Sequence, residues 1–247
     1  MSAKYYRLLK RSGNFIRNDV VDVTFTYDFD DPLLAELEVK WGLRKIAGEG
    51  DTQSRALNLL HWLCMHTRHG NPQSLPEGLR MDAQSLLDWS YDQPGNDPNG
   101  KHLSIVFSEC MLAVGIRAYA LWCYPKVFKG EKACVVQAWL PEEDRWIMLD
   151  PSFHVYFIDE TGWIFSASEV RERLGSSAVL RLNPEGQGVA DWYADSMAKN
   201  MYYFSRMRDM RYGAMQEGVH WVYLCPVGYD LQDEESPVYA TYDRFWK

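Results

Sequence analysis

The sequence of 247 residues lacks any long apolar segment. Its first 19 residues have neither the apolar core nor the small-residue cleavage site of a secretory signal. No later run approaches the roughly 20 apolar residues of a membrane span. The five cysteines are scattered, without the short paired spacings of a zinc site or a disulfide scaffold. We therefore expect a cytoplasmic protein that has no membrane partner.

Positive charge is also in short supply. The chain has 26 basic and 34 acidic residues, for a formal net charge of -8. This balance disfavours a nucleic-acid backbone or an anionic membrane as the main partner. Internal repeats and low-complexity tracts are absent as well. We expect no cofactor and no metal, and the sequence leaves the oligomeric state open.

Aromatic residues, in contrast, are abundant, at 14% of the chain with ten Trp and fifteen Tyr. Such side chains mainly fill protein interiors, so a large core is the first explanation. A peptide groove lined by tryptophan is the alternative. The candidates for either role are Trp139, Trp146, Trp163 and Trp192.

Turn residues and hydrophobic periodicity divide the chain into three parts. Residues 1–50 combine a strand-like alternation with a leucine-rich helical segment, and we expect an N-terminal elaboration there. Residues 51–190 should form the core. Residues 191–247 read as a helical extension packed on that core.

Within the core, one helix is predicted from Asp51 to Gly70 by its capping residue, its spaced leucines and its terminal glycine. A second helix should begin at Asn99 and Gly100 and stop at Gly115, because its apolar residues recur every three or four positions. Three short segments rich in branched and aromatic residues then predict consecutive antiparallel strands over 116–124, 133–140 and 145–150.

The start of the second helix is where thiol chemistry would be favoured. A helix N-terminus offers unpaired backbone N–H groups and the positive end of the helix dipole, which stabilise a thiolate. A working thiol enzyme also needs a histidine base and a third group that orients that base.

Residues 99–124 and 133–153 resemble motif segments of transglutaminase-like proteins, which have a papain-like fold. The resemblance extends over roughly residues 52–165, with looser similarity to bacterial members beyond it. It implies an α+β fold with a central helix packed on an antiparallel sheet. The matching residues are Gly115, Ile116, Arg117, Trp146, Leu149, Asp150 and Pro151.

The resemblance also implies where a catalytic triad would stand. Gly100 occupies the position of the nucleophilic cysteine, and Cys134 occupies that of the histidine. Only the orienting carboxylate, Asp150, is retained. The chain is therefore similar to a degenerate member that has lost triad chemistry and binds a peptide- or amide-type ligand in the old cleft.

Four further residues are candidates for ligand binding. His102 lies in the first helical turn, and Gln93 precedes Gly100 in the position of an oxyanion-hole glutamine. Trp139 is a candidate aromatic contact, and His154 follows the Asp-Pro pair closely enough to partner Asp150.

Two other functions remain open. The chain could be an active thiol hydrolase or transferase in which Cys134 attacks and His102 or His154 is the base. It could also be a structural or interaction module that no longer uses the cleft. Less favoured alternatives are a reactive Cys110 and a metal site formed by His102, Cys134 and Asp150.

Overall fold

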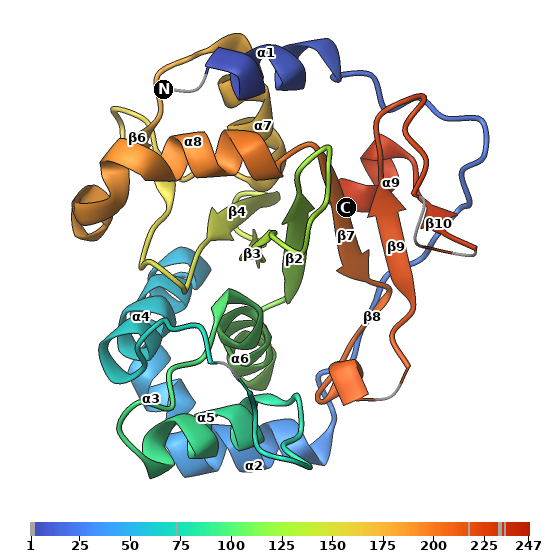
Figure 1. Cartoon of the computed structure of the whole chain (residues 1–247). Coiled ribbons are helices and arrows are strands. Elements are labelled where there is room, and N and C mark those ends of the chain that lie inside the picture. Colours follow the sequence, from blue (N-terminus) through green and yellow to red (C-terminus); the bar gives the residue numbers. More distant parts are fainter. Residues whose placement is uncertain (1–2, 73, 217, 232–233, 235) are drawn as a thin grey trace.

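The computed structural model describes residues 3–72, 74–216, 218–231, 234 and 236–247. They form an α+β fold in which one mixed sheet lies between two groups of helices (Figure 1). Helices α2 to α6 lie on one side of the sheet, and α1, α7 and α8 lie on the other. The expected α+β class is confirmed.

The main sheet has six strands in the order β10-β9-β7-β2-β3-β4. All neighbours are antiparallel except β10 and β9, which are parallel. The strands are β2 (Ala118–Tyr124), β3 (Ala133–Leu140), β4 (Arg145–Leu149), β7 (Tyr203–Met207), β9 (Trp221–Leu224) and β10 (Val238–Tyr239). Two small pairs lie outside it: β1 (Thr26–Tyr27) with β8 (Asp209–Met210), and β5 (Phe157–Ile158) with β6 (Arg181–Leu182).

Helix α6 (Gly100–Ala113) is the central helix, and it packs against β2 and β3. It is buried on every side from His102 to Leu112, as expected for a helix enclosed by other elements. The Asn99 side chain accepts a hydrogen bond from the backbone of His102 and fixes the first turn. Gly115, with φ 79°, ends the helical segment. The predicted limits of this helix are confirmed.

Helices α2 (Pro32–Trp41), α4 (Thr52–His66) and α5 (Ala83–Asp92) contact α6 on this side of the sheet, and α3 (Leu43–Ala47) packs on α4 and α2. The leucine-rich segment predicted as one helix is two, because Gly42 adopts φ 63° and breaks the run between α2 and α3. No helix in the described part of the chain is long and apolar enough to cross a bilayer.

The C-terminal part departs from the expectation of a helical extension over 191–247. Helices α7 (Ala167–Ser176) and α8 (Ala190–Asn200), joined through the 3-10 helix η1 (Pro184–Val189), are followed by strands, the 3-10 helix η2 (Ala214–Gln216) and the short α9 (Tyr242–Trp246). The helical prediction is therefore wrong after Asn200. All five residues of β7 are buried, so this strand lacks the alternation that identifies a strand in a sequence. The proposed division at residues 50 and 190 stays a prediction.

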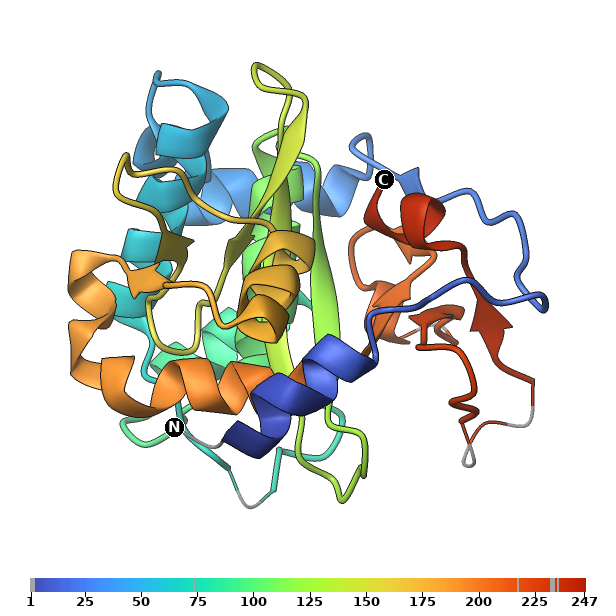
Figure 2. The same ribbon diagram turned by 90° about the horizontal axis from the view of Figure 1, so that it is seen from above.

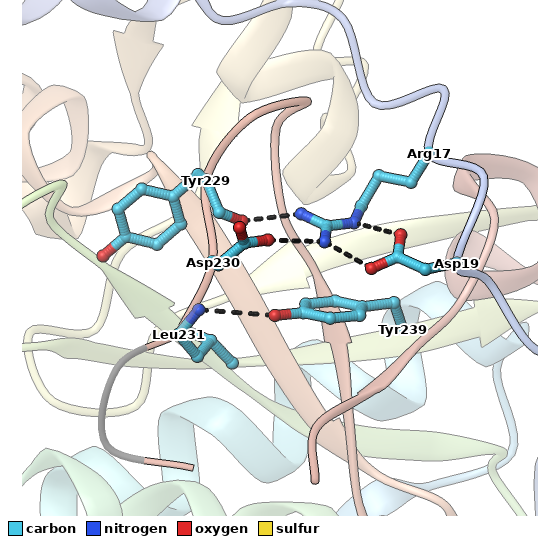
Figure 3. A network of polar contacts seen from close by, with 6 residues as sticks. All are labelled: Arg17, Asp19, Tyr229, Asp230, Leu231 and Tyr239. Atoms are coloured by element: carbon cyan, nitrogen blue, oxygen red, sulfur yellow. Dashed lines mark hydrogen bonds and ion pairs between the residues drawn. The ribbon is translucent and has the colours of Figure 1, made fainter. Parts of the chain in front are cut away.

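The segment that follows α1 brings the N-terminal part of the chain into contact with the C-terminal strands (Figure 2). Helix α1 (Ala3–Arg11) packs on α7 and α8, and the segment after it runs to the C-terminal strands. Val20 forms a parallel bridge with Tyr239 there. The Arg17 guanidinium pairs with Asp19 and with Asp230, and it lies 3.9 Å from the centre of the Tyr239 ring (Figure 3).

Glu109, on α6, has a carboxyl group that is buried in the core. Its two oxygens accept hydrogen bonds from the backbone N–H of Ala83, at 2.7 Å, and of Gly213, at 3.0 Å. It therefore connects α6 to the start of α5 and to the loop after β8. Burial raises the pKa of Glu109 to about 8, although these two bonds oppose the rise.

This raised pKa predicts a pH-dependent stability that Glu109→Gln should remove. Between the ordinary pKa of a glutamate and about 8, the folded chain holds a proton that the unfolded chain has released. The free energy of unfolding should therefore fall as pH rises from 5 to 8, by at most about 1.4 kcal/mol per pH unit. Urea unfolding of the wild type and Glu109→Gln across this range measures the difference. Parallel pH profiles would contradict the prediction, and the exposed Glu49→Gln is the control.

Candidate functional site

Gly100, Cys134 and Asp150 line one cavity of about 590 Å³ beside the start of α6. They come from three elements: the first residue of α6, the beginning of β3 and the residue that follows β4. The other walls are formed by the loop after α4, the loop between β2 and β3, and helix α8. The topology thus brings together the three positions that the resemblance to transglutaminase-like proteins assigns to a triad.

Gly100 lies next to the Ser152 hydroxyl. A Cβ atom at this position would lie 2.9 Å from Ser152 Oγ and 4.0 Å from His69 Nε2. The first distance is shorter than real Cβ contacts, so Ser152 would have to move to admit any side chain. The helix start therefore faces the cavity as backbone alone, with the N–H groups that helix N-termini leave without intrahelical partners.

Cys134 is poorly suited to attack a substrate. Its side chain is only 6% exposed, and burial raises the pKa of the thiol to about 12. The positive charges of Lys132 and Lys101 act in the opposite direction but do not overcome burial. Because the thiolate is the nucleophilic form, this burial opposes nucleophilic attack by the thiol at neutral pH.

The carboxyl group of Asp150 is buried and already has its partners. Its Oδ2 accepts a hydrogen bond of 2.6 Å from the Tyr193 hydroxyl, and its Oδ1 accepts one of 2.7 Å from the Ser152 backbone N–H. Burial raises the pKa of Asp150 to about 6, against the effect of these bonds. Asp150 therefore joins the end of β4 to helix α8, and neither of the two hydrogen-bond donors is a histidine.

His102 points into the packing of its own helix rather than into the cavity. It is 4% exposed, and its Nδ1 accepts a hydrogen bond of 3.3 Å from the backbone N–H of Asn99. Burial lowers the pKa of His102 to about 4, so the imidazole is neutral and completes a capping box. His102 therefore has a structural role at the start of α6 and does not line the cavity.

The other three predicted binding residues also lie away from the cavity. Gln93 is an exposed residue at the end of α5. Trp139 packs edge-on against Trp146, with ring centres 5.3 Å apart. His154 lies beside Cys64 in a neighbouring depression, and its ring centre is 5.3 Å from that of His61. None of the four therefore lines the cavity, although His102 is bonded to Asn99 at its edge.

Several cavity residues were not identified from the sequence: His69, Lys101, Lys132 and Tyr193. Trp192, one of the four tryptophans considered for an aromatic groove, does line the cavity. Lys101 and Lys132 are next to or near predicted positions, so their charge could have been found by inspecting the neighbours of Gly100 and Cys134. His69 comes from the irregular segment after α4, where no periodicity fixes a direction. Trp192 and Tyr193 lie on a helix whose orientation depends on tertiary packing.

The cavity is lined by charges of both signs, and the buried Asp150 carboxyl is one of the negative groups. Lys101 and Lys132 add two positive charges, and the N-terminus of α6 adds the positive end of a helix dipole. Glu131 also lines the cavity but is paired with Lys199. Among the residues that the structure places, three or more metal-ligating side chains do not cluster anywhere. The arrangement suits a carbonyl or carboxylate group.

Removing the Tyr193 hydroxyl should weaken the fold at this site. Tyr193→Phe leaves one oxygen of the buried Asp150 carboxyl without its partner, which should cost about 1–3 kcal/mol in the free energy of unfolding. Urea denaturation measures the loss. The exposed Tyr91→Phe is the matched control and should stay within about 0.5 kcal/mol of the wild type. Equal stabilities of the two variants would show that the Tyr193–Asp150 bond contributes nothing.

No family model and no curated protein sequence matches this chain. A "Putative Cysteine Protease" from Cytophaga hutchinsonii is 11% identical, with 69% of this chain and 57% of that chain covered and a TM-score of 0.38. A "putative protease" from Parabacteroides distasonis is 12% identical, with 53% and 30% covered and a TM-score of 0.32. Rad4–Rad23 bound to a 6-4 photoproduct UV lesion is 11% identical, with 83% and 41% covered and a TM-score of 0.34. This chain spans less than two thirds of each of these chains, and similarity at this level carries no information about activity.

Proposed function

We propose that the chain is a non-catalytic protein of transglutaminase-like architecture that binds a peptide- or amide-type ligand in the cavity at the start of α6. The observation that carries the proposal is the convergence of Gly100, Cys134 and Asp150 on one cavity of about 590 Å³. That volume is within the range of roughly 300–1,000 Å³ of small-ligand sites.

The chemistry of the cavity favours binding over turnover. Gly100 offers no nucleophile, and the Cys134 thiol stays protonated because it is buried. The start of α6 still presents backbone N–H groups, which hold a carbonyl or carboxylate oxygen in the way that an oxyanion hole does. A bound amide is therefore polarised at its oxygen and is not attacked at its carbon.

The rim of the cavity supplies contacts for the rest of a peptide. Lys101 and Lys132 favour a terminal carboxylate or an acidic side chain. Trp192, which is 44% exposed, stands on α8 with its ring edge-on to Phe153 and offers an aromatic surface. A partly exposed tryptophan beside a polar site is typical of recognition surfaces.

Binding can be tested with the unprotected carboxylate of acetyl-trialanine as the probe. The amide resonances of Gly100 and Lys101 should shift saturably in a heteronuclear NMR titration, and mass spectrometry should find the peptide intact. Trp192→Ala should weaken binding about tenfold, whereas Trp163→Ala should not. The control is matched, because Trp163 is 40% exposed and does not line this cavity.

Two outcomes of this titration would count against the proposal. Cleavage of the peptide would favour a thiol enzyme. Absence of shifts at the start of α6 would favour an interaction module that does not use the cleft.

One observation supports an active thiol enzyme as the second candidate. His69 lines the same cavity as Cys134, so it replaces His102 and His154 as the base that this alternative requires. The raised pKa of Cys134 opposes the alternative.

Alkylation by iodoacetamide at pH 7 separates these two candidates. With a thiol pKa of about 12, Cys134 should react at least about 10³-fold more slowly than an exposed cysteine of ordinary pKa. Preferential labelling of Cys134, removed by His69→Gln, would overturn the non-catalytic proposal.

A restored triad provides the positive control for the labelling experiment. Gly100→Cys with Cys134→His places a thiol at the helix start and an imidazole next to Asp150. Ser152→Ala should be added, because Ser152 Oγ occupies the space beside position 100. The triple variant should gain a rapidly alkylated thiol, since a helix N-terminus lowers a thiol pKa.

A further inference from the structure

Arg171 is a buried cation on α7 that lacks a counter-ion. It is 7% exposed, and its hydrogen bonds go to neutral acceptors only. Nε donates to the Met201 carbonyl oxygen at 3.0 Å, and Nη2 donates to the Ser12 carbonyl oxygen at 2.8 Å and to Ser12 Oγ at 3.2 Å. No carboxylate among the placed residues forms an ion pair with it.

Arg17 is a second enclosed arginine, and its partners can be compared with those of Arg171. The Arg17 side chain is 8% exposed, and it is paired with Asp19 at 2.6 Å and with Asp230 at 2.7 Å (Figure 3). Both arginines also lie against an aromatic ring, Tyr239 for Arg17 and Phe15 for Arg171. The two sites therefore differ mainly in the missing anion at Arg171.

An unpaired cation in this position is costly to the folded state. Burial lowers the pKa of Arg171 to about 10, which reports the loss of hydration that no carboxylate offsets. Buried charges in proteins are normally paired or bound to an ion. An anion that reached the guanidinium would remove this penalty.

The guanidinium is accessible from a cavity of about 590 Å³ between α1, the chain after it, and α7. Nη1 makes no hydrogen bond to the described residues, and it is not among the fully enclosed side-chain atoms that lack a partner. Lys10 and Glu172 also line the cavity, and their opposite charges offset each other. Arg171 therefore sets the sign of the charge that the cavity prefers.

One wall of this cavity is apolar. Leu9 and Phe15 are buried, while Ile16 is 83% exposed and Tyr242 is 41% exposed. The neutral polar residues of the lining are Asn14, Ser168 and Ser176. A buried cation beside an apolar wall is complementary to a small molecule that carries one anionic group on an apolar body. The cavity shares no lining residue with the one at the start of α6.

We propose that the cavity between α1 and α7 is a second ligand site, which binds an amphipathic carboxylate. The carboxylate accepts a hydrogen bond from Arg171 Nη1, and the apolar body lies along Leu9, Phe15 and Ile16. The site is independent of the function proposed for the cleft.

Calorimetric titration of the full chain with octanoate and with octanamide tests the charge requirement. The two probes have the same apolar chain and differ in the negative charge. Octanoate should bind at least about tenfold more tightly, because a hydrogen bond between two charged groups is the stronger kind. Equal affinities, or no octanoate binding up to about 5 mM, would overturn the proposal.

Variants locate the binding. Arg171→Gln should lower the affinity for octanoate about tenfold, and the affinity for octanamide should stay within about twofold of the wild-type value. Ile16→Asp places a carboxylate at the rim and should lower the affinity for octanoate about fivefold. Val39→Asp, at an exposed site on α2, should leave that affinity unchanged. The Ile16→Asp and Val39→Asp comparison decides the matter if Arg171→Gln does not fold. Equal octanoate affinities in those two variants would place the binding elsewhere.

Discussion

The buried carboxyl group of Asp150 determines much of the arrangement around the cleft. A carboxyl group removed from water must find hydrogen-bond donors, and it finds them in the Tyr193 hydroxyl and the Ser152 backbone. These two bonds connect the end of β4, the turn after it and helix α8. In a triad the same carboxyl group would orient a histidine, but here it orients a tyrosine. A group suited to catalysis thus serves to hold α8 over the sheet.

The turn after Asp150 also shapes the environment of Gly100. Ser152 follows Asp150 by two residues, and its hydroxyl oxygen lies 2.9 Å from where a Cβ at position 100 would stand. The turn that satisfies Asp150 therefore also places a hydroxyl beside the start of α6. A side chain at position 100 requires this hydroxyl to rotate away, while the other neighbouring atoms are at ordinary contact distance.

The central helix and its strands could be predicted because their signals are local. Asn99 caps α6, Gly115 ends it, and the regular apolar spacing between them needs no tertiary information. The three cleft positions came from the resemblance to transglutaminase-like proteins, carried over onto these elements. Strand β7 was missed because it is buried on both faces and has no alternation. His69 and Tyr193 could not be assigned to the cleft, because a loop path and a helix orientation depend on contacts between distant segments.

The four candidate binding residues also show that the direction of a side chain depends on tertiary contacts. His102, Gln93, Trp139 and His154 were chosen for their residue type and their proximity in the sequence. Residue type is a poor guide to direction, and the structure turns His102 into a cap and Trp139 toward Trp146. Arg171 illustrates the opposite case. Nothing in its sequence surroundings marks it, and it stands out only when its burial is compared with the partners available to it.

The contacts between the N-terminal segment and the last strand have a consequence for the order in which the chain folds during synthesis. Val20 pairs with Tyr239, and Arg17 reaches Asp230, so contacts join residues more than two hundred positions apart. Such contacts form late, because loop closure over that length is entropically costly. During translation Arg17 and Val20 therefore have to wait for these partners until the segment from Asp230 to Tyr239 has been made, whereas α1 can dock earlier on α7 and α8. The edge of β9 that pairs with β10 stays open over the same period, and an open strand edge is a site for unwanted pairing.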